Sequence, residues 1–182
     1  LRMLDARNFP VGELLPLASE RSAGKKVQFK GEPFAVGNLR EFAKNISQER
    51  PELALFSAGA AVSREFAPAF TSAGCFVVDN SSAYRMEPDI PLVVPEVNAG
   101  ALSKEKKLIS NPNCSTIQMV VVLNPLHKAA GIKRVIVATY QAVSGAGARA
   151  VEELKEQTKA ISDGREIPPP QKFPYRIAFN LI

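Results

Sequence analysis

Two short apolar stretches, separated by a predicted helix, constrain the fold of this chain more than any other feature. Residues 53–56 are wholly apolar, and residues 75–80 form a second apolar stretch with a polar end. Residues 62–73 between them have the character of a helix that ends at Gly74. Buried strands that follow one another through a helix are typical of a parallel sheet. The pattern therefore predicts an α/β fold with a doubly wound sheet, in which ligands lie at the carboxyl ends of the strands.

The segment 110–116 carries the most specific chemical signal, a cysteine between Asn-Pro-Asn and two hydroxyl residues. Pro112 restricts the residue before it to an extended conformation, so a strand that arrives there ends. Asn113 is a good helix N-cap, which places Cys114 in the first helical turn. There the positive end of the helix macrodipole favours the thiolate, the nucleophilic form of cysteine. The alternative is a structural role as a small buried hydrophobic residue, which is commoner among cysteines.

The other segments extend the predicted element order. Alternating or wholly apolar runs predict strands, apolar spacing predicts helices, and proline and glycine mark the irregular connections. We expect strands at residues 26–30, 91–98, 107–110 and 135–141. We expect helices at residues 1–4, within a connection at 10–18, at 39–46, at 117–123 as a buried helix ending at Gly131, and at 148–160.

The charge and the counts of cysteine and histidine argue against several classes of function. A formal charge of +5 over 182 residues is modest, and the basic residues are scattered rather than gathered as a nucleic-acid surface requires. Two cysteines, Cys75 and Cys114, are too few for a disulfide framework, and one histidine, His127, leaves little scope for a metal site. No apolar run reaches the ~18 residues of a membrane span. We therefore expect a cytoplasmic protein with no bound metal and no membrane or nucleic-acid partner.

Four motifs in this order resemble the aspartate-β-semialdehyde dehydrogenases, over nearly the whole chain. They are DNSSAYR at residues 79–85, PLVVPEVN at 91–98, SNPNCST at 110–116 and TYQAVSG at 139–145. The resemblance implies a Rossmann-like NADP-binding domain over residues 1–113 and the start of an α+β catalytic and dimerisation domain over residues 114–182. It also implies that both domains are incomplete here. The family's glycine-rich loop would precede residue 1, and its acid/base histidine would follow residue 182.

The resemblance implies a reaction as well as a fold. Enzymes of this family reduce L-aspartyl 4-phosphate to L-aspartate 4-semialdehyde with NADPH, reversibly, on the route to lysine, threonine and methionine. By resemblance, Cys114 attacks the acyl carbon and forms a thioester, phosphate leaves, and hydride transfer leads to the aldehyde. The small-molecule substrate and phosphate are then the expected partners, together with a second copy of the chain in a homodimer or a dimer of dimers.

The same resemblance assigns further residues to the substrate. Gln141 matches the family's substrate-orienting glutamine, whose amide can both donate and accept hydrogen bonds. Arg85 matches the phosphate-binding arginine, because a guanidinium fork suits a phosphate dianion. Asn113 is expected to contact the phosphate in addition to capping its helix. Since the family's catalytic histidine lies in a later segment, His127 is not assigned that role.

Seven residues match the family's cofactor positions. Arg21 and Ser22 match a pair that binds the 2′-phosphate of NADP, for which a cation and a hydroxyl are suited. The others are small residues that let the backbone approach a ligand, and they are Ser57, Ala58, Gly59, Ser144 and Gly145.

Three other interpretations stay open at the level of sequence. An N-acetyl-gamma-glutamyl-phosphate reductase has glycine before its cysteine and an aromatic residue after it, whereas this chain has Asn113 and Ser115. A glyceraldehyde-phosphate dehydrogenase is less favoured, because its cysteine precedes Thr-Thr-Asn. A non-catalytic fragment is the alternative from another class. We expect the 182 residues alone to be inactive, because the glycine-rich loop and the acid/base histidine are not among them.

Overall fold

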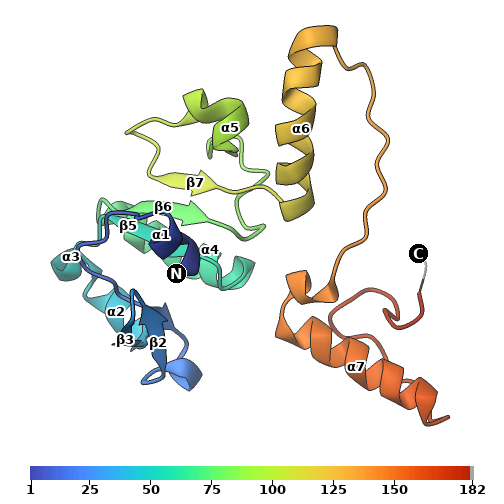
Figure 1. Cartoon of the computed structure of the whole chain (residues 1–182). Coiled ribbons are helices and arrows are strands. Elements are labelled where there is room, and N and C mark those ends of the chain that lie inside the picture. Colours follow the sequence, from blue (N-terminus) through green and yellow to red (C-terminus); the bar gives the residue numbers. More distant parts are fainter. Residues whose placement is uncertain (181–182) are drawn as a thin grey trace. The chain divides into compact units, whose positions relative to one another are not determined.

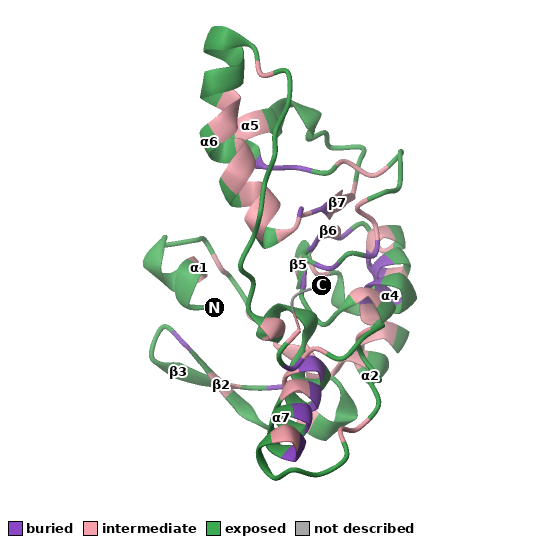
Figure 2. Ribbon diagram, turned by 90° about the vertical axis from the view of Figure 1, so that its right-hand side faces the viewer, coloured by how far each residue is buried: buried purple, intermediate pink, exposed green. Residues whose placement is uncertain are grey.

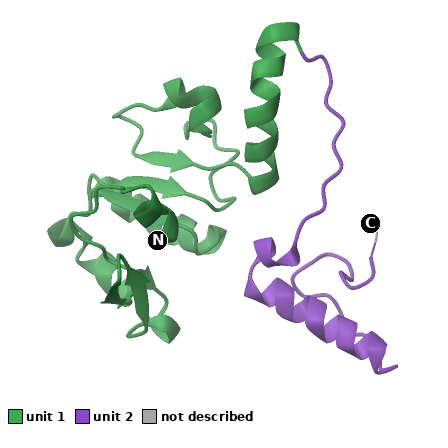
Figure 3. Cartoon of the chain, viewed as in Figure 1, with its two compact units in different colours: residues 1–131 green, residues 132–182 purple. Residues whose placement is uncertain are grey.

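The computed structural model describes residues 1–180, and the chain divides into two compact units, residues 1–131 and 132–182 (Figures 1 and 3). Each unit is described by itself below. No helix within residues 1–180 combines the length and the apolar character that crossing a membrane requires.

The centre of the first unit is a three-stranded parallel sheet. Its strands are β5 (Leu53–Phe56), β6 (Phe76–Asp79) and β7 (Leu108–Ser110), and they lie side by side in that order. In this register Phe56, Asp79 and Ser110 are neighbours at the carboxyl edge. The α/β fold with a Rossmann-like parallel sheet, predicted from residues 53–80, is therefore confirmed.

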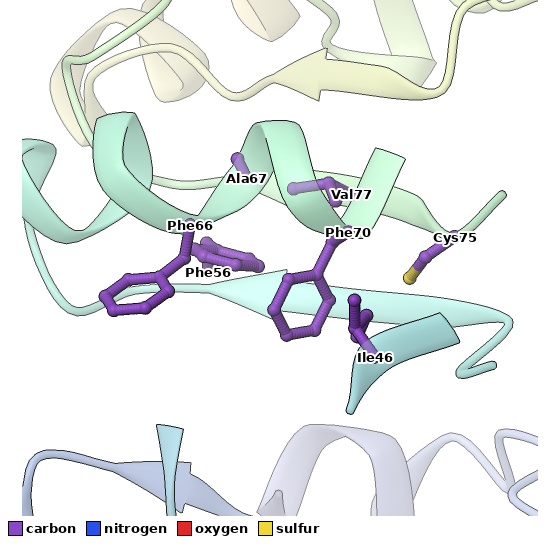
Figure 4. Close-up of a cluster of buried hydrophobic side chains, with 7 residues drawn as sticks. All are labelled: Ile46, Phe56, Phe66, Ala67, Phe70, Cys75 and Val77. Atoms are coloured by element: carbon purple, nitrogen blue, oxygen red, sulfur yellow. The ribbon is translucent and has the colours of Figure 1, made fainter. Parts of the chain in front are cut away.

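Helix α4 (Ala60–Ser72) covers one face of this sheet and forms the hydrophobic core of the unit with it (Figure 4). The ring of Phe70 meets that of Phe56 edge to face, with centroids 5.2 Å apart. Val77 and Cys75 are fully buried in the same cluster. Burying side chains of this size contributes about 1.5–3 kcal/mol each to the stability of the fold, so this face holds α4 on the sheet.

The other elements of the first unit are shorter. They are α1 (Arg2–Ala6), β1 (Leu17–Ala18), the 3₁₀ helix η1 (Glu20–Ser22), β2 (Lys26–Phe29), β3 (Glu32–Ala35), β4 (Gly37–Asn38), α2 (Leu39–Lys44), α3 (Ile46–Glu49), α5 (Pro95–Asn98), the 3₁₀ helix η2 (Ala99–Ala101) and α6 (Cys114–Ala130).

The predicted helix within residues 10–18 is wrong. Two prolines and a glycine lie among these nine residues, and they disfavour a helix. Instead, β1 pairs in parallel with β4. The predicted strand at 26–30 is confirmed as β2, and it forms an antiparallel hairpin with β3. Lys30 and Gly31 join them with φ of 50° and 83°, as a two-residue hairpin turn with positive φ at both positions requires.

The predicted strand over residues 91–98 is wrong in its second half. Leu92 makes one isolated parallel bridge to Ser110, and α5 begins at Pro95. Proline suits the first position of a helix, because its missing N–H would have no partner there and its φ is already helical. The side chain of Asn98 holds the bend, because it accepts a bond from Val94 N at 2.8 Å and donates one to Leu92 O at 3.0 Å.

Helix α6 is confirmed as a helix that ends at Gly131, but its predicted burial is wrong. None of its residues is buried, and Val122 and Leu126 are 62% and 55% exposed. An apolar helix becomes buried only where another element covers it, and no element of the first unit covers the face that carries Val122 and Leu126. Helix α6 belongs to the first compact unit, residues 1–131. The boundary expected between the cofactor-binding domain and the catalytic domain, at residues 113/114, is a division by function and stays a prediction.

The second unit contains η3 (Val143–Ala146) and α7 (Ala148–Ser162). The predicted strand at 135–141 is wrong for the described chain, because no described segment pairs with it and Ile136 is 84% exposed. A strand is stable only with a partner for its N–H and C=O groups. The predicted helix over 148–160 is confirmed as α7.

The buried residues of α7 lie along one side of the helix (Figure 2). Two of them, Glu153 and Gln157, bind the segment that follows the helix. Glu153 Oε2 accepts hydrogen bonds from the backbone N–H groups of Gln171 and Lys172. One turn later Gln157 Oε1 accepts bonds from Ile177 N at 3.0 Å and Ala178 N at 3.1 Å. Two side chains thus satisfy four backbone donors that would otherwise be without protein partners there.

We predict that Gln157→Leu speeds amide hydrogen exchange at Ile177 and Ala178 by about 10-fold or more. The reason is that an unsatisfied buried donor costs about 1–3 kcal/mol. Exchange is measured by NMR or mass spectrometry. Glu156→Leu, at an exposed position on the same helix, serves as the control and is expected to leave both rates unchanged. Equal rates in the two variants would contradict the prediction.

We also predict that Cys75 resists alkylation in the native protein. Burial raises the pKa of its thiol to about 11, against a smaller opposite effect of Lys107. Only the thiolate reacts with iodoacetamide, and a thiol with a pKa of about 11 is almost wholly protonated at pH 8. Mass spectrometry after iodoacetamide treatment at pH 8 should find Cys75 modified only when denaturant is present. Equal modification without denaturant would show that the thiol is accessible and ionised.

Candidate active site

The cysteine turn lies directly after β7. Asn111 continues the sheet by one bond, from its N–H to Asp79 O at 2.8 Å, and Pro112 after it is buried. Asn113 is the N-cap of α6, since its Oδ1 accepts a bond from Ser115 N at 3.0 Å. Cys114 is the first residue of this 17-residue helix and is exposed. The predicted N-cap and the placement of Cys114 in the first turn are therefore confirmed.

Arg85 reaches this turn from the loop after β6. Its Nε donates a hydrogen bond to Asn111 O at 2.9 Å, and its Nη2 donates one to Asn80 O at 3.1 Å. These carbonyls follow β7 and β6, so the guanidinium is attached to the carboxyl ends of two neighbouring strands. The bonds occupy one edge of the guanidinium. Nη1 has no hydrogen-bond partner within residues 1–180, which leaves donors for an anion.

Two residues in this region were missed by sequence reasoning, Asn80 and Asn111. Their side chains bond to each other, from Asn111 Nδ2 to Asn80 Oδ1 at 2.7 Å. The signal that could have found them is that Asn80 ends the predicted strand 75–80 and Asn111 follows the predicted strand 107–110, and parallel neighbouring strands end at the same edge of a sheet. The amide bridge joins the two motifs that contain Arg85 and Cys114.

The buried carboxylate of Asp79 supports the same loop from within. Its Oδ1 accepts bonds from Ser63 Oγ on α4 at 2.7 Å and from Ser81 N at 3.0 Å. Its Oδ2 accepts a bond from Ser81 Oγ at 2.8 Å, and Ser81 Oγ in turn accepts one from Ala83 N at 3.0 Å. Asp79 lies at the carboxyl edge of the sheet, where a ligand was expected, but it is buried and its carboxylate oxygens bind Ser63 and Ser81 instead.

The first-unit residues expected to bind the cofactor lie in open turns. Ser57, Ala58 and Gly59 connect β5 to α4, and all three are exposed. Gly59 has φ of 96°, and apart from the glycine and its chain neighbours no atom lies within 4 Å of the position its Cβ would take. Only glycine adopts this φ readily, and the open space lets a ligand approach the backbone. Arg21 and Ser22 lie in η1, with Arg21 exposed. The residues at these positions are therefore compatible with a bound nucleotide.

The remaining site residues belong to the second unit. Gln141 is exposed, and Thr139 Oγ1 lies 3.4 Å from its Oε1. Ser144 and Gly145 lie in η3 and are also exposed. The structure thus brings Arg85 to the turn of Asn113 and Cys114, while the geometry of the second-unit residues toward that turn stays a prediction.

No metal site accompanies this arrangement in the part of the chain that the structure describes. Residues 1–180 contain no group of three or more histidine, cysteine, aspartate and glutamate side chains able to hold a metal ion. His127 lies in the last turn of α6.

Comparisons with known proteins place these features in a family. The family model described as "Semialdehyde dehydrogenase, NAD binding domain" matches residues 1–105, and the model "Semialdehyde dehydrogenase, dimerisation domain" matches residues 123–182. An aspartate-semialdehyde dehydrogenase of Aquifex aeolicus is 57% identical over 184 residues, and one of Prochlorococcus marinus is 50% identical over 185 residues. These alignments cover 100% of this chain and 53% and 52% of the relatives, so the chain spans about half of their length.

Solved structures give the same result. The crystal structure of aspartate semialdehyde dehydrogenase II from Vibrio cholerae matches with a TM-score of 0.83 and 48% identity, over 99% of this chain and 53% of that one. A probable aspartate-semialdehyde dehydrogenase from Pseudomonas aeruginosa matches with a TM-score of 0.74 and 32% identity, over 98% and 52%. With its parallel sheet, its cysteine turn and these likenesses in sequence and structure, the chain belongs to the semialdehyde dehydrogenase family, and it is similar to the aspartate-semialdehyde dehydrogenases named above.

Proposed function

We propose that the whole protein catalyses the NADP-dependent reductive dephosphorylation of L-aspartyl 4-phosphate to L-aspartate 4-semialdehyde, reversibly. The observation that carries the proposal is the exposed Cys114 at the start of α6, next to a turn that holds Arg85. A nucleophile beside an anchored guanidinium suits an acyl phosphate, because one group attacks the carbonyl carbon while the other binds the leaving phosphate.

In the first step, the thiolate of Cys114 attacks the acyl carbon. The new S–C bond replaces the C–O bond to phosphate, which leaves as inorganic phosphate. The guanidinium of Arg85 provides the charge that holds this dianion, with the Asn113 side chain as a second contact. A thiolate is suited to both halves of the reaction, because it is a good nucleophile and a good leaving group.

In the second step, the thioester on Cys114 is reduced and released. The nicotinamide cofactor, when bound, supplies the hydride for this reduction. Collapse of the resulting thiohemiacetal breaks the S–C bond, which returns the thiolate of Cys114 and liberates the aldehyde. Gln141 orients the substrate through its amide, which can donate to an oxygen and accept from an amine.

The cofactor-binding residues follow the same proposal. Arg21 and Ser22 hold the 2′-phosphate that distinguishes NADP from NAD, through charge and a hydroxyl hydrogen bond. Ser57, Ala58 and Gly59 offer the cofactor an open turn at the end of β5. Ser144 and Gly145 line the nicotinamide. The names of the relatives and the match to a NAD binding domain support a nicotinamide cofactor.

The setting of the protein is part of the proposal. Its product serves lysine, threonine and methionine biosynthesis in the cytoplasm, and it works as a homodimer or a dimer of dimers. The match of residues 123–182 to a dimerisation domain supports the assembly.

The proposal is tested on the purified whole protein by phosphate-dependent reduction of NADP with L-aspartate 4-semialdehyde. NAD and N-acetyl-glutamate 5-semialdehyde are compared in parallel assays. We expect turnover with the aspartate compound and a preference for NADP. Turnover with the acetylated compound alone would instead support the alternative reductase.

We predict that Cys114→Ser lowers kcat in the whole protein by at least about 10³-fold, because loss of the nucleophile removes the covalent step. Cys75→Ala is the control, since Cys75 is buried in the core, and it should retain kcat within a few-fold. Near-native kcat in Cys114→Ser would rule out the nucleophile assignment, provided that both variants keep the circular dichroism spectrum of the wild type.

We predict that Arg85→Lys raises the KM for phosphate by about 10-fold or more and changes the KM for NADP little. Lysine keeps the charge but loses the planar fork and its two carbonyl bonds. Arg40→Lys provides a matched control, since Arg40 pairs with Glu65 on the surface. If the KM for NADP rose instead while that for phosphate stayed constant, Arg85 would belong to the cofactor site.

A further inference from the structure

We propose that Asn80 and Asn111 are positioning residues for Arg85, and that their amide–amide hydrogen bond fixes the two carbonyls that orient its guanidinium. This inference rests on the proposed function, in which Arg85 binds phosphate. Neither asparagine touches phosphate in the proposal, because both act through Arg85.

Arg85, Asn80 and Asn111 form a closed set of hydrogen bonds that connects the ends of β6 and β7. Asn80 N donates to Phe56 O at 2.9 Å, which ties the end of β6 to β5, and Asn111 N donates to Asp79 O at 2.8 Å. The carbonyls of the same two asparagines accept from Arg85 at 3.1 Å and 2.9 Å. The side-chain bond of 2.7 Å closes the set. It joins the two strand ends just beyond the last paired residues, Asp79 and Ser110.

Arg85 needs such support because it does not lie in a helix or a strand. Its side chain is long, and ordering an arginine costs up to about 2 kcal/mol of rotamer entropy. The start of its loop is already fixed, since Asp79 holds Ser81 and Ser81 holds Ala83 N. The two carbonyls fix the other end, the guanidinium, and an arginine held in place before binding loses less entropy when the anion arrives.

The chemistry of the bridge also suits a phosphate site. Two amides hold the strand ends without adding charge. A carboxylate at either position could keep a hydrogen bond to the other amide. It would also place a negative charge near Arg85, which weakens the attraction of the guanidinium for a phosphate dianion. The inference therefore explains why neutral side chains suit both strand ends.

The test is a double-mutant cycle in the whole protein with Asn80→Ala, Asn111→Ala and both together. Each single change should raise the KM for inorganic phosphate about 5-fold, as expected for one hydrogen bond of about 1 kcal/mol. The double change should raise it no further, because residues that act through one bond are not additive. We expect kcat and the KM for NADP to stay within about two-fold. In an Arg85→Lys background, neither alanine should raise the phosphate KM again.

A control and a second measurement separate this inference from the proposed function. Asn38→Ala removes the N-cap bond to Arg40 N of 2.9 Å, away from the strand ends, and should leave the phosphate KM unchanged. Phosphate binding is also measured without turnover, by the protection that inorganic phosphate gives Cys114 against iodoacetamide. A wild-type protein that is protected by phosphate but inactive with aspartate semialdehyde would overturn the proposed substrate only.

The inference itself is overturned by either of two results. In one, the effects of the two alanines on phosphate affinity multiply in the double variant. In the other, both single variants keep wild-type phosphate protection of Cys114. Asn111→Asp provides an independent comparison, because it can keep the bridge through a flipped Asn80 amide. It is expected to weaken phosphate binding more than Asn111→Ala, through its charge.

Discussion

The buried carboxylate of Asp79 is the interaction on which the first unit depends. It accepts hydrogen bonds from Ser63 on α4 and from both the N–H and the hydroxyl of Ser81. Its own strand, β6, is the central strand of the sheet. One ionisable group therefore joins the helix, the sheet and the loop that leads to Arg85. A buried charge is tolerated only when such bonds satisfy it, so the loop and α4 must keep their places for the carboxylate to stay buried.

The chemistry of the cysteine turn is local, and this is why it could be predicted from sequence. Asn113 caps α6 through contacts within two residues, and Cys114 follows as the first helical residue. Proline and asparagine specify such a turn without help from distant segments. The sheet was predictable for a related reason, since strands 53–56 and 75–80 are apolar enough to be buried wherever they pair.

The parts that could not be predicted depend on partners. A stretch such as 135–141 has the composition of a strand, but composition does not supply the neighbour that a strand needs. The prediction that α6 is buried was wrong for the same reason, because the sequence of a helix does not supply the element that would cover it. The attachment of Arg85 was also invisible, because its partners are backbone carbonyls, and every residue carries one. Proline caused the opposite error at Pro95, because a residue placed inside the predicted strand 91–98 begins a helix.

The exposed apolar face of α6 has a thermodynamic consequence. The heat capacity change on unfolding grows with the apolar surface that becomes newly exposed to water. Because Val122 and Leu126 are already more than half exposed in the folded chain, unfolding α6 adds little to that change. The helix α4, whose phenylalanines are buried against the sheet, adds far more per residue. The face of the sheet that α4 covers therefore contributes more than α6 to the curvature of the stability of the first unit with temperature.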